Sequence, residues 1–288
     1  MWTDHKRNQY RIQPIGIQAY HTGKEEMKTG FIGCGNMASA MIRGMLGSGV
    51  AQREEMMASA KRAQSAIRIR DELGLSAGSN REVAAFADVL FLAVKPKIYA
   101  EVINEIKDCV RDDTLVVSMA PGKSLELLQE MFGRQVKLIR IMPNTPAQVG
   151  EGMTGVCTGS NVTEEELACV MRLLEAFGKA AVVDEHLMDA VTAVSGSSPA
   201  YVFMFIEALA DGAVAEGMPR KDAYLFAAQA VLGSAKMVLE SGLHPGELKD
   251  MVCSPAGTTI EAVASLERDS LRSAVMEAVR VCAKKSRG

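Results

Sequence analysis

Short apolar runs alternate with segments of helical periodicity through the first two thirds of the chain. Runs typical of strands lie at residues 29–33, 55–59, 89–94, 115–118, 137–142 and 180–183, with shorter ones near Leu75 and near Gly155. Helical segments lie between them, at about 36–46, up to Leu73, up to about Asp108 and at 164–177. The last of these has a Thr163–Glu166 capping box and ends before Gly178. Alternating strands and helices predict an α/β unit with a parallel sheet.

From His186 to the end of the chain, the strand patterns disappear and only helices are predicted. One helix spans about 199–216, a second spans about 221–240, and a third follows Gly257. The first is apolar on nearly all sides and therefore requires burial all round. Roughly 100 residues form too small a core for this purpose, so we expect a second copy of the chain to cover the helix in an obligate homodimer. A membrane span is not expected, because Glu207 and Asp211 interrupt the run and no apolar run reaches the roughly 18 residues needed.

The turn after the first strand has the composition of a dinucleotide-binding site. It reads Gly33-Cys34-Gly35-Asn36-Met37-Ala38, the pattern G-x-G-x-x-A between a strand and a helix. Gly33 permits a tight turn, Gly35 lets the backbone approach a pyrophosphate, and Ala38 lets the helix pack on the strand. The free N–H groups of the first helical turn then face the anion. A plain glycine-rich turn is the alternative.

The end of the second strand favours NADPH over NADH. An NAD-preferring site has Asp or Glu there for the ribose 2′-hydroxyl, whereas this chain has Ser59-Ala60-Lys61-Arg62. A hydroxyl followed by two cations suits a 2′-phosphate. A solvated helix start is the alternative, and NADH remains a second candidate donor.

Other predicted strands also end in small or polar residues and prolines. These ends are Ala93-Val94-Lys95-Pro96, Met119-Ala120-Pro121-Gly122 and Pro143-Asn144-Thr145-Pro146. Ligands of open α/β sheets lie beyond the carboxyl ends of the strands, so we expect these turns along one edge, at the nucleotide. Ordinary strand-ending turns are the alternative.

A loop of small residues precedes the helix after Gly257. It reads Cys253-Ser254-Pro255-Ala256-Gly257-Thr258-Thr259. Successive backbone N–H groups and two threonine hydroxyls predict an anion site with hydrogen-bonding specificity. Alternatively, Ser254 or Thr258 only caps the helix.

Composition excludes several classes of function. The 288 residues carry a net charge of −3, with 48% hydrophobic residues, so no basic surface for nucleic acid is expected. Six scattered cysteines lack both disulfide and metal-ligand spacing, which predicts reduced thiols, no metal and a cytoplasmic protein. His186 and His244 are candidate acids, although structural roles are the more usual ones.

Residues 1–26 differ from the rest of the chain. They are polar and basic, and they lack the apolar segment of a secretory signal. Met27 directly precedes the first strand, with which this kind of fold normally begins. We therefore expect Met27 to be the natural start and residues 1–26 to be an extraneous or disordered extension.

Taken together, these motifs resemble the pyrroline-5-carboxylate reductase family. The resemblance covers nearly all of residues 27–285 and rests on the segments at 30–37, 93–96, 142–146, 189–192, 195–197 and 244–250. Ser-Pro-x-Gly-x-Thr-Ile at 254–260 is the most specific segment. Three positions depart from the usual pattern: Pro121 replaces Ala, and Ser198 and Ala256 replace Gly. Ala256 matters most, because its methyl group lies in the proposed anion loop.

The resemblance implies a Rossmann cofactor domain at 27–185 and an all-helical dimerisation and substrate domain at 186–288, in dimers that often form larger rings. It implies reduction of 1-pyrroline-5-carboxylate to L-proline by NAD(P)H. The implied cofactor residues are Gly33, Cys34, Gly35, Asn36, Met37, Ser59, Asn80, Ala93, Val94, Lys95, Pro96, Met119 and Ala120. The implied substrate residues are Ser254, Gly257, Thr258 and Thr259, with backbone N–H groups of Gly257 and Thr258 on the carboxylate and the catalytic Thr259 hydroxyl on the ring nitrogen.

Two other functions remain open from the sequence. A related imine or β-hydroxyacid reductase would share the architecture, but such enzymes usually use a Lys or Asp on the long interdomain helix. Glu207 and Asp211 occur there without a nearby Lys. A nucleotide-sensing module without turnover is the third reading, and the intact Thr258-Thr259 pair argues against it.

Overall fold

The computed structural model describes residues 27–60 and 63–287. The predictions on residues 1–26 and on Lys61 and Arg62 therefore lie outside the described residues. The chain divides into two compact units between Gly196 and Ser197, with the last residues, from Ser286, belonging to the first unit.

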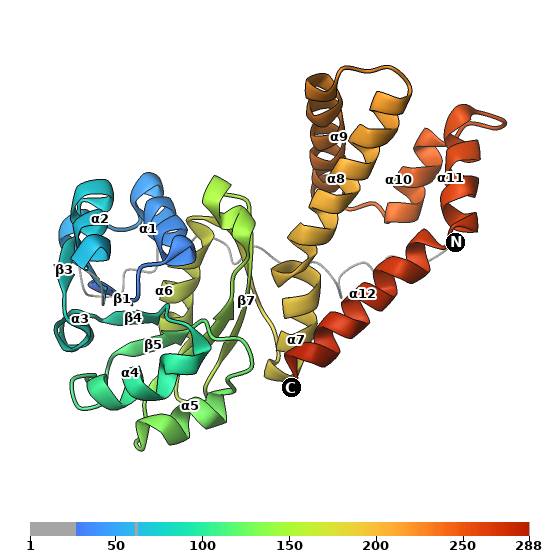
Figure 1. The fold of residues 1–288 in the computed structure, drawn as a ribbon. Helices are drawn as coiled ribbons and strands as arrows, with labels where there is room; N and C mark the ends of the chain where they lie inside the picture. The colour runs from blue at the N-terminus through green and yellow to red at the C-terminus, as the bar shows by residue number, and fades with distance from the viewer. Residues whose placement is uncertain (1–26, 61–62, 288) are drawn as a thin grey trace. The chain divides into compact units, whose positions relative to one another are not determined.

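The first unit contains one eight-stranded sheet (Figure 1). Its strands are β1 Thr29–Ile32, β2 Met56–Ser59, β3 Ser76–Gly78, β4 Val89–Leu92, β5 Leu115–Ser118, β6 Lys137–Met142, β7 Gly152–Thr158 and β8 Gly178–Val182. Their order is β3-β2-β1-β4-β5-β6-β7-β8. The strands from β3 to β6 are parallel, β7 is antiparallel to β6, and β8 is parallel to β7. The predicted α/β class is confirmed.

Helices cover both faces of this sheet. Helices α1 Asn36–Ser48, α2 Ala63–Leu73 and α6 Glu164–Glu175 pack on one face, and α3 Asn80–Phe86, α4 Tyr99–Ile106 and α5 Leu125–Phe132 on the other. A hydrophobic core lies on each face of the sheet, and successive strand residues point into one core and then the other. Phe31 and Phe91 face the first core and stack with their ring centroids 4.7 Å apart, whereas Leu90 and Leu92 face the second.

Three predictions for the first unit were wrong in detail. Helix α5 was not predicted; its N-cap Ser124 accepts a hydrogen bond from the Leu127 N–H at 3.1 Å. Strand β7 is longer than predicted and antiparallel. Gly178 begins β8 instead of capping α6, with φ +146°, and a Cβ there would lie 2.1 Å from the Gly152 carbonyl oxygen. Close backbone pairing between two strands therefore explains this glycine.

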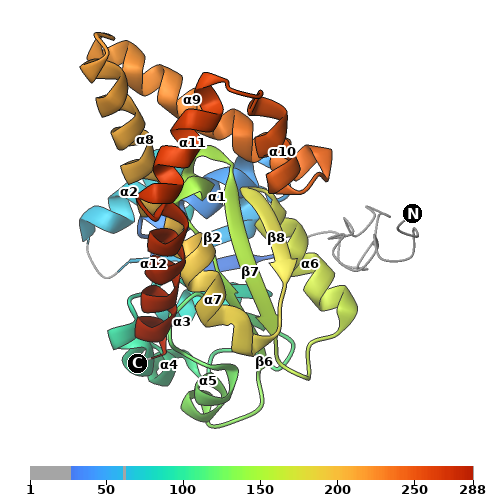
Figure 2. The same cartoon turned by 90° about the vertical axis from the view of Figure 1, so that its right-hand side faces the viewer.

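The second unit is helical, and no described residue after His186 lies in a strand. Helix α7 Met188–Val191 and a π-helical turn, Thr192–Gly196, precede it. Its helices are α8 Ser198–Ala215, α9 Arg220–Ser241, α10 Pro245–Val252, α11 Thr258–Arg268 and α12 Leu271–Ser286, the last of which ends in the first unit. Helices α8 and α9 lie side by side as a hairpin (Figures 1 and 2). Their contact is built on small residues, Ala210, Ala223 and Ala227.

Helix α8 leaves most of its apolar side chains exposed in the single chain. Val202, Phe203, Met204, Phe205 and Leu209 are all exposed, and α9 exposes a further set that includes Leu225 and Phe226. The helical stretch Glu185–Ala215 is long and apolar enough to cross a membrane by length and composition alone, with a mean hydropathy of 1.2 in its most apolar window. The core helix of a soluble protein passes the same test, and 11% of this window is buried within the chain.

Candidate functional site

A pocket of about 320 Å³ lies beyond the carboxyl ends of β1, β4, β5 and β6. It is lined by Gly35, Asn36, Met37, Ala38, Ala93, Val94, Lys95, Met119, Pro121, Met142 and Pro143. Seven of the predicted cofactor residues belong to this lining, from Gly35 to Met37, Ala93 to Lys95 and Met119. The sheet order changes direction between β1 and β4, and this switch point is where open α/β sheets bind ligands.

Two glycines, Gly33 and Gly35, have different roles in the glycine-rich turn. Gly33 has φ +90°, and a Cβ there would lie 2.8 Å from both the Ala93 carbonyl oxygen and Val94 Cγ1. Gly35 has an ordinary φ of −82°, and a Cβ there would meet no atom within 4 Å. Gly33 is therefore required by the fold, whereas Gly35 leaves open space beside the backbone for a ligand.

The start of α1 is suited to an anion. Gly35 is the N-cap, and no side chain caps the helix. The first N–H groups of a helix have no intrahelical partner, and the helix dipole adds a partial positive charge there. A pyrophosphate is the group that such a site in a dinucleotide-binding unit receives.

Ser59 and Asn80 do not line the pocket but stabilise the glycine-rich turn through hydrogen bonds. Ser59 is only 2% exposed; its hydroxyl accepts from the Gly33 N–H at 3.4 Å and donates to Asn80 Oδ1 at 2.6 Å. Asn80 in turn donates to Glu105 Oε2 at 2.8 Å. The Ser59 hydroxyl proton is thus bonded to Asn80, and a direct contact of Ser59 with a 2′-phosphate stays a prediction.

Four other predicted cofactor residues lie beside the lining. Ala120 is buried in the core under the sheet edge. Pro96 is exposed and begins a 3₁₀ turn, Pro96–Ile98. Gly33 and Cys34 shape the turn through their backbone. Met142 and Pro143, at the end of β6, do line the pocket, although they were not chosen as cofactor residues from the sequence. Their position at the same sheet edge was the available signal.

Tyr99 is a supporting residue that the sequence did not single out. Its hydroxyl donates to the Leu92 carbonyl oxygen at 2.5 Å and accepts from the Met119 N–H at 3.3 Å, which ties the ends of β4 and β5 together. Burial raises the pKa of Tyr99 to about 12, against a smaller lowering by hydrogen bonds from Ser118 and Met119. Only the packing of α4 over the sheet places this hydroxyl between two pocket-lining turns.

The second candidate site is the loop before α11. Gly257 is the N-cap of α11, and no side chain caps the helix. The capping alternative for Ser254 and Thr258 is therefore excluded. Thr258 and Thr259 are the first two helical residues, and their N–H groups have no intrahelical partner.

The conformation of this loop depends on Ala256 and Gly257. The Gly257 N–H donates to the Ser254 carbonyl oxygen at 3.0 Å, so it is not free for a carboxylate as predicted. A Cβ on Gly257 would lie 2.3 Å from Ser254 Oγ. Ala256 has φ +54°, in the left-handed region that favours glycine. The alanine therefore strains the loop backbone at the point where it departs from the resembled pattern.

The two histidines of the described residues, His186 and His244, lie outside these two sites. His244 Nδ1 accepts from the Gly246 N–H at 3.0 Å and so caps α10, whereas His186 is exposed. All six cysteines are free thiols, and burial raises the pKa of Cys157 to about 11, which keeps that thiol protonated. Among the residues that the structure describes, no group of three His, Cys, Asp or Glu could hold a metal ion.

Comparison with known proteins matches both parts of the chain. Residues 185–288 match the family model described as pyrroline-5-carboxylate reductase dimerisation, and residues 28–122 match the model described as NADP oxidoreductase, coenzyme F420-dependent. Pyrroline-5-carboxylate reductase from Escherichia coli is 52% identical over 262 residues, which cover 91% of this chain and 97% of the relative. The chain belongs to the pyrroline-5-carboxylate reductase family.

Solved structures of this reductase family agree. A pyrroline-5-carboxylate reductase from Coxiella burnetii is 32% identical, with a TM-score of 0.85 over 90% of this chain and 97% of that one. A pyrroline carboxylate reductase from Plasmodium falciparum, solved with NADP bound, is 34% identical, with a TM-score of 0.83 over 92% and 98%. The Rossmann sheet and the helical second half predicted from the resemblance to this reductase family are thereby confirmed.

Proposed function

We propose that this chain reduces 1-pyrroline-5-carboxylate to L-proline with NADPH, the last step of proline biosynthesis, and that NADH is the alternative donor. The observation that carries the proposal is the pocket at the β1–β4 switch point, with a glycine-rich turn and an open helix start, in a chain 52% identical to a named reductase. When bound, the cofactor supplies a hydride to the C=N carbon of the cyclic imine. The proposal also assigns the first domain, residues 27–185, to the cofactor and residues 186–288 to substrate and dimerisation.

Residues around the pocket orient the cofactor. The N–H groups at the start of α1 bind the pyrophosphate, beside Gly35, Asn36 and Met37. Ala93, Val94, Lys95 and Met119 form the opposite wall. Gly33, Cys34, Ser59, Asn80, Pro96 and Ala120 act indirectly, because they shape or support the turns that line the pocket.

The loop before α11 binds the substrate. The N–H groups of Thr258 and Thr259 receive its carboxylate, since the Gly257 N–H is held by Ser254. The Thr259 hydroxyl hydrogen-bonds the ring nitrogen and fixes the face of the imine that accepts the hydride. An imine that enters protonated needs no strong protein acid, so positioning dominates over proton transfer.

The active protein is a homodimer, because the apolar faces of α8 and α9 need cover. Each fully buried large apolar side chain contributes about 1.5–3 kcal/mol, and several are available on each copy. Assembly of dimers into a ring, a cytoplasmic location and the absence of nucleic-acid and membrane partners complete the proposal.

The deciding experiment measures oxidation of NADPH and of NADH with 1-pyrroline-5-carboxylate at matched concentrations. Turnover with proline as product is the expected result. Nucleotide binding without turnover would instead indicate a sensing module or a changed substrate.

A pair of variants tests the role of Thr259. Thr259→Val keeps the shape but removes the hydroxyl, and we expect kcat/KM to fall by about tenfold to a hundredfold. Thr259→Ser keeps the hydroxyl and should remain within a few-fold of the wild type. Equal activity of the two variants would remove Thr259 from the mechanism.

A further inference from the structure

Arg68 connects helix α2 with the nucleotide-binding turn. Its Nη2 group donates to the Cys34 carbonyl oxygen and to Ser39 Oγ, the latter at 3.4 Å. Cys34 lies between the two glycines of the turn, and Ser39 lies near the start of α1. The guanidinium is half-buried, so these contacts hold a positive charge beside the turn.

The contact with Cys34 orients the turn. In a trans peptide the C=O and the following N–H point in opposite directions. Because Arg68 holds the Cys34 carbonyl on its own side, the Gly35 N–H points away from Arg68. The side chain therefore helps to set the direction of a backbone donor next to the pocket that contains Gly35.

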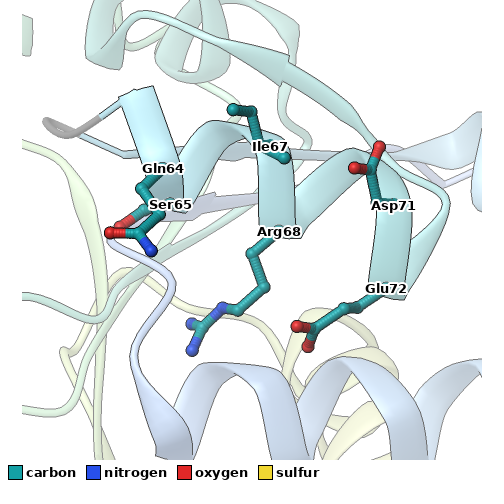
Figure 3. A pocket seen from close by; sticks show the side chains of 6 residues that line it. All are labelled: Gln64, Ser65, Ile67, Arg68, Asp71 and Glu72. Carbon is teal, nitrogen blue, oxygen red and sulfur yellow. The ribbon is translucent and has the colours of Figure 1, made fainter.

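A second pocket, of about 400 Å³, lies along the side of α2 that carries Arg68 (Figure 3). It is lined by Gln64, Ser65, Ile67, Arg68, Asp71 and Glu72. In Figure 3 the Arg68 side chain extends away from the helix, with the polar Gln64 and Ser65 nearer the start of the helix. Gln64 and Ser65 can donate hydrogen bonds to the same anion as Arg68.

Neither acidic residue of this pocket forms an ion pair with Arg68. In Figure 3 Asp71 points away from the guanidinium, whereas Glu72 extends on the same side as Arg68 and its Oε2 pairs with Arg43 Nη2 on α1 at 3.4 Å. Within residues 27–60 and 63–287, no carboxylate forms an ion pair with Arg68, and its hydrogen bonds to Cys34 and Ser39 both use Nη2. The fork of a guanidinium has five donors, so Nε and Nη1 remain for a ligand.

The position of Arg68, on the helix that follows β2, indicates which anion it binds. Helix α2 follows β2, and in dinucleotide-binding units the adenosine ribose lies at the end of this strand, where an arginine accommodates a 2′-phosphate. Ser59, at the end of β2, is buried and already bonded to Asn80. We propose that Arg68 binds the phosphate on the adenosine ribose of NADPH and thereby sets the preference for NADPH over NADH. This inference rests on the proposed nucleotide-dependent function.

Binding of nucleotide fragments tests the role of Arg68 without any turnover. The probes are adenosine 2′,5′-bisphosphate and AMP, which differ by the 2′-phosphate, titrated calorimetrically into the full-length wild type and into Arg68→Gln. We expect Arg68→Gln to weaken the bisphosphate at least about tenfold more than AMP, because the loss of the Cys34 contact affects both probes and the loss of the 2′-phosphate contact affects only the bisphosphate. Arg68→Lys, which keeps the charge but loses the fork, should lie between them.

Arg70→Gln is the matched control, because it removes the same charge from an exposed position of the same helix. It should leave both affinities within about twofold of the wild type. Lys61 and Arg62 are unchanged in all variants, so their contribution cancels from the comparison. Melting temperatures of all variants show that the fold is retained.

Steady-state kinetics give the second readout. For Arg68→Gln the KM for NADPH should rise about tenfold more than the KM for NADH, because only NADPH loses a contact to its 2′-phosphate. Equal losses for both nucleotides, or for bisphosphate and AMP, would show that Arg68 only tethers the turn and would overturn the proposal. Absence of turnover with 1-pyrroline-5-carboxylate would contradict the proposed function alone, because the fragment titrations still decide the role of Arg68.

Discussion

The two units of this chain use apolar residues in opposite ways. In the first unit the largest apolar side chains, such as Phe31, Phe91 and Phe177, are fully buried between the sheet and its helices. In the second unit the buried cluster between α8 and α9 consists of three alanines, while Phe203, Met204 and Leu225 are each more than 60% exposed. The first unit thus completes its own core, and the second presents its core residues to another molecule.

This difference shows that the apolar pattern of a segment does not determine whether its side chains are buried within the single chain. Strands buried on both faces and a helix apolar on all sides both require cover. A sheet finds that cover in the helices that follow each strand along the same chain. Helices α10, α11 and α12 follow the α8–α9 hairpin but leave its large apolar side chains exposed, so we expect their cover to come from association.

The largest effect is expected from a charge on the exposed apolar face of the second unit. Phe203→Asp places a charge on α8 where we propose the partner copy packs, and an unpaired buried charge costs several kcal/mol. We expect a monomer by light scattering and activity at least about tenfold lower at equal protein concentration. Val149→Asp, at an exposed apolar position of the first unit, is the control and should leave a dimer. A stable, active Phe203→Asp dimer would contradict the proposed interface.

The next effect separates folding from binding within the first unit. Gly33→Ala introduces a Cβ at φ +90° that would lie 2.8 Å from the Ala93 carbonyl oxygen, so we expect a loss of about 2 kcal/mol or more in unfolding free energy. Gly35→Ala meets no neighbouring atom, so it should change stability by less than about 1 kcal/mol but weaken NADPH binding. Thermal melts and nucleotide titrations of both variants measure the contrast. Equal destabilisation by Gly33→Ala and Gly35→Ala would contradict a structural role for Gly33 and a ligand-binding role for Gly35.

A smaller effect concerns the link between β4 and β5. Tyr99→Phe removes the hydrogen bonds to Leu92 and Met119, and we expect a loss of about 1–2 kcal/mol in stability.

The same tyrosine predicts a pH dependence. Because its pKa is raised from 10 to about 12 in the folded state, its contribution is complete below pH 10 and is lost as the pH rises through about 12. Denaturant melts between pH 8 and about 11.5 should show a steeper alkaline loss for the wild type than for Tyr99→Phe. Parallel curves would show that Tyr99 does not carry this dependence.

The smallest effect sharpens the description of the loop before α11. Ala256→Gly removes a left-handed alanine at φ +54°, and we expect a gain of up to about 1 kcal/mol in stability. Ala256→Val should lose more than Ala256→Gly gains, because a β-branched residue tolerates this conformation least. Melts of the dimer and the KM for the substrate measure both changes. A stabilising Ala256→Val would exclude backbone strain at this position.

The sequence predicted the organisation of the fold where its signals are local. Alternation of strands and helices, the glycine-rich turn before α1 and the capping box of α6 all depend on neighbouring residues, and each is present. The strands at 115–118 and 137–142 also have their predicted bounds. The sequence analysis missed α5, although α4 of the same length was predicted, and the direction of β7 depends on its partner strand rather than on its own composition.

The candidate sites were predictable as motifs but not as sets of contacts. Residues of the glycine-rich turn and of the turn after β4 were identified, because glycine content and strand ends are visible in the chain. The sequence does not show which hydroxyl and N–H groups already form hydrogen bonds within the protein. Ser59 is bonded to Asn80 and the Gly257 N–H to Ser254, so both groups have partners that their residue types do not indicate.

By itself, then, the sequence determined the order of the elements, the nucleotide-binding turn and the family, since each follows from periodicity or from motifs of adjacent residues. Only the tertiary structure decided that Tyr99 joins two strand ends, that Arg68 reaches Cys34 and that the buried cluster between α8 and α9 consists of alanines. These features depend on residues distant in sequence that packing brings within a few ångströms. Hydrogen bonds and burial are set by that packing and not by the composition of either partner.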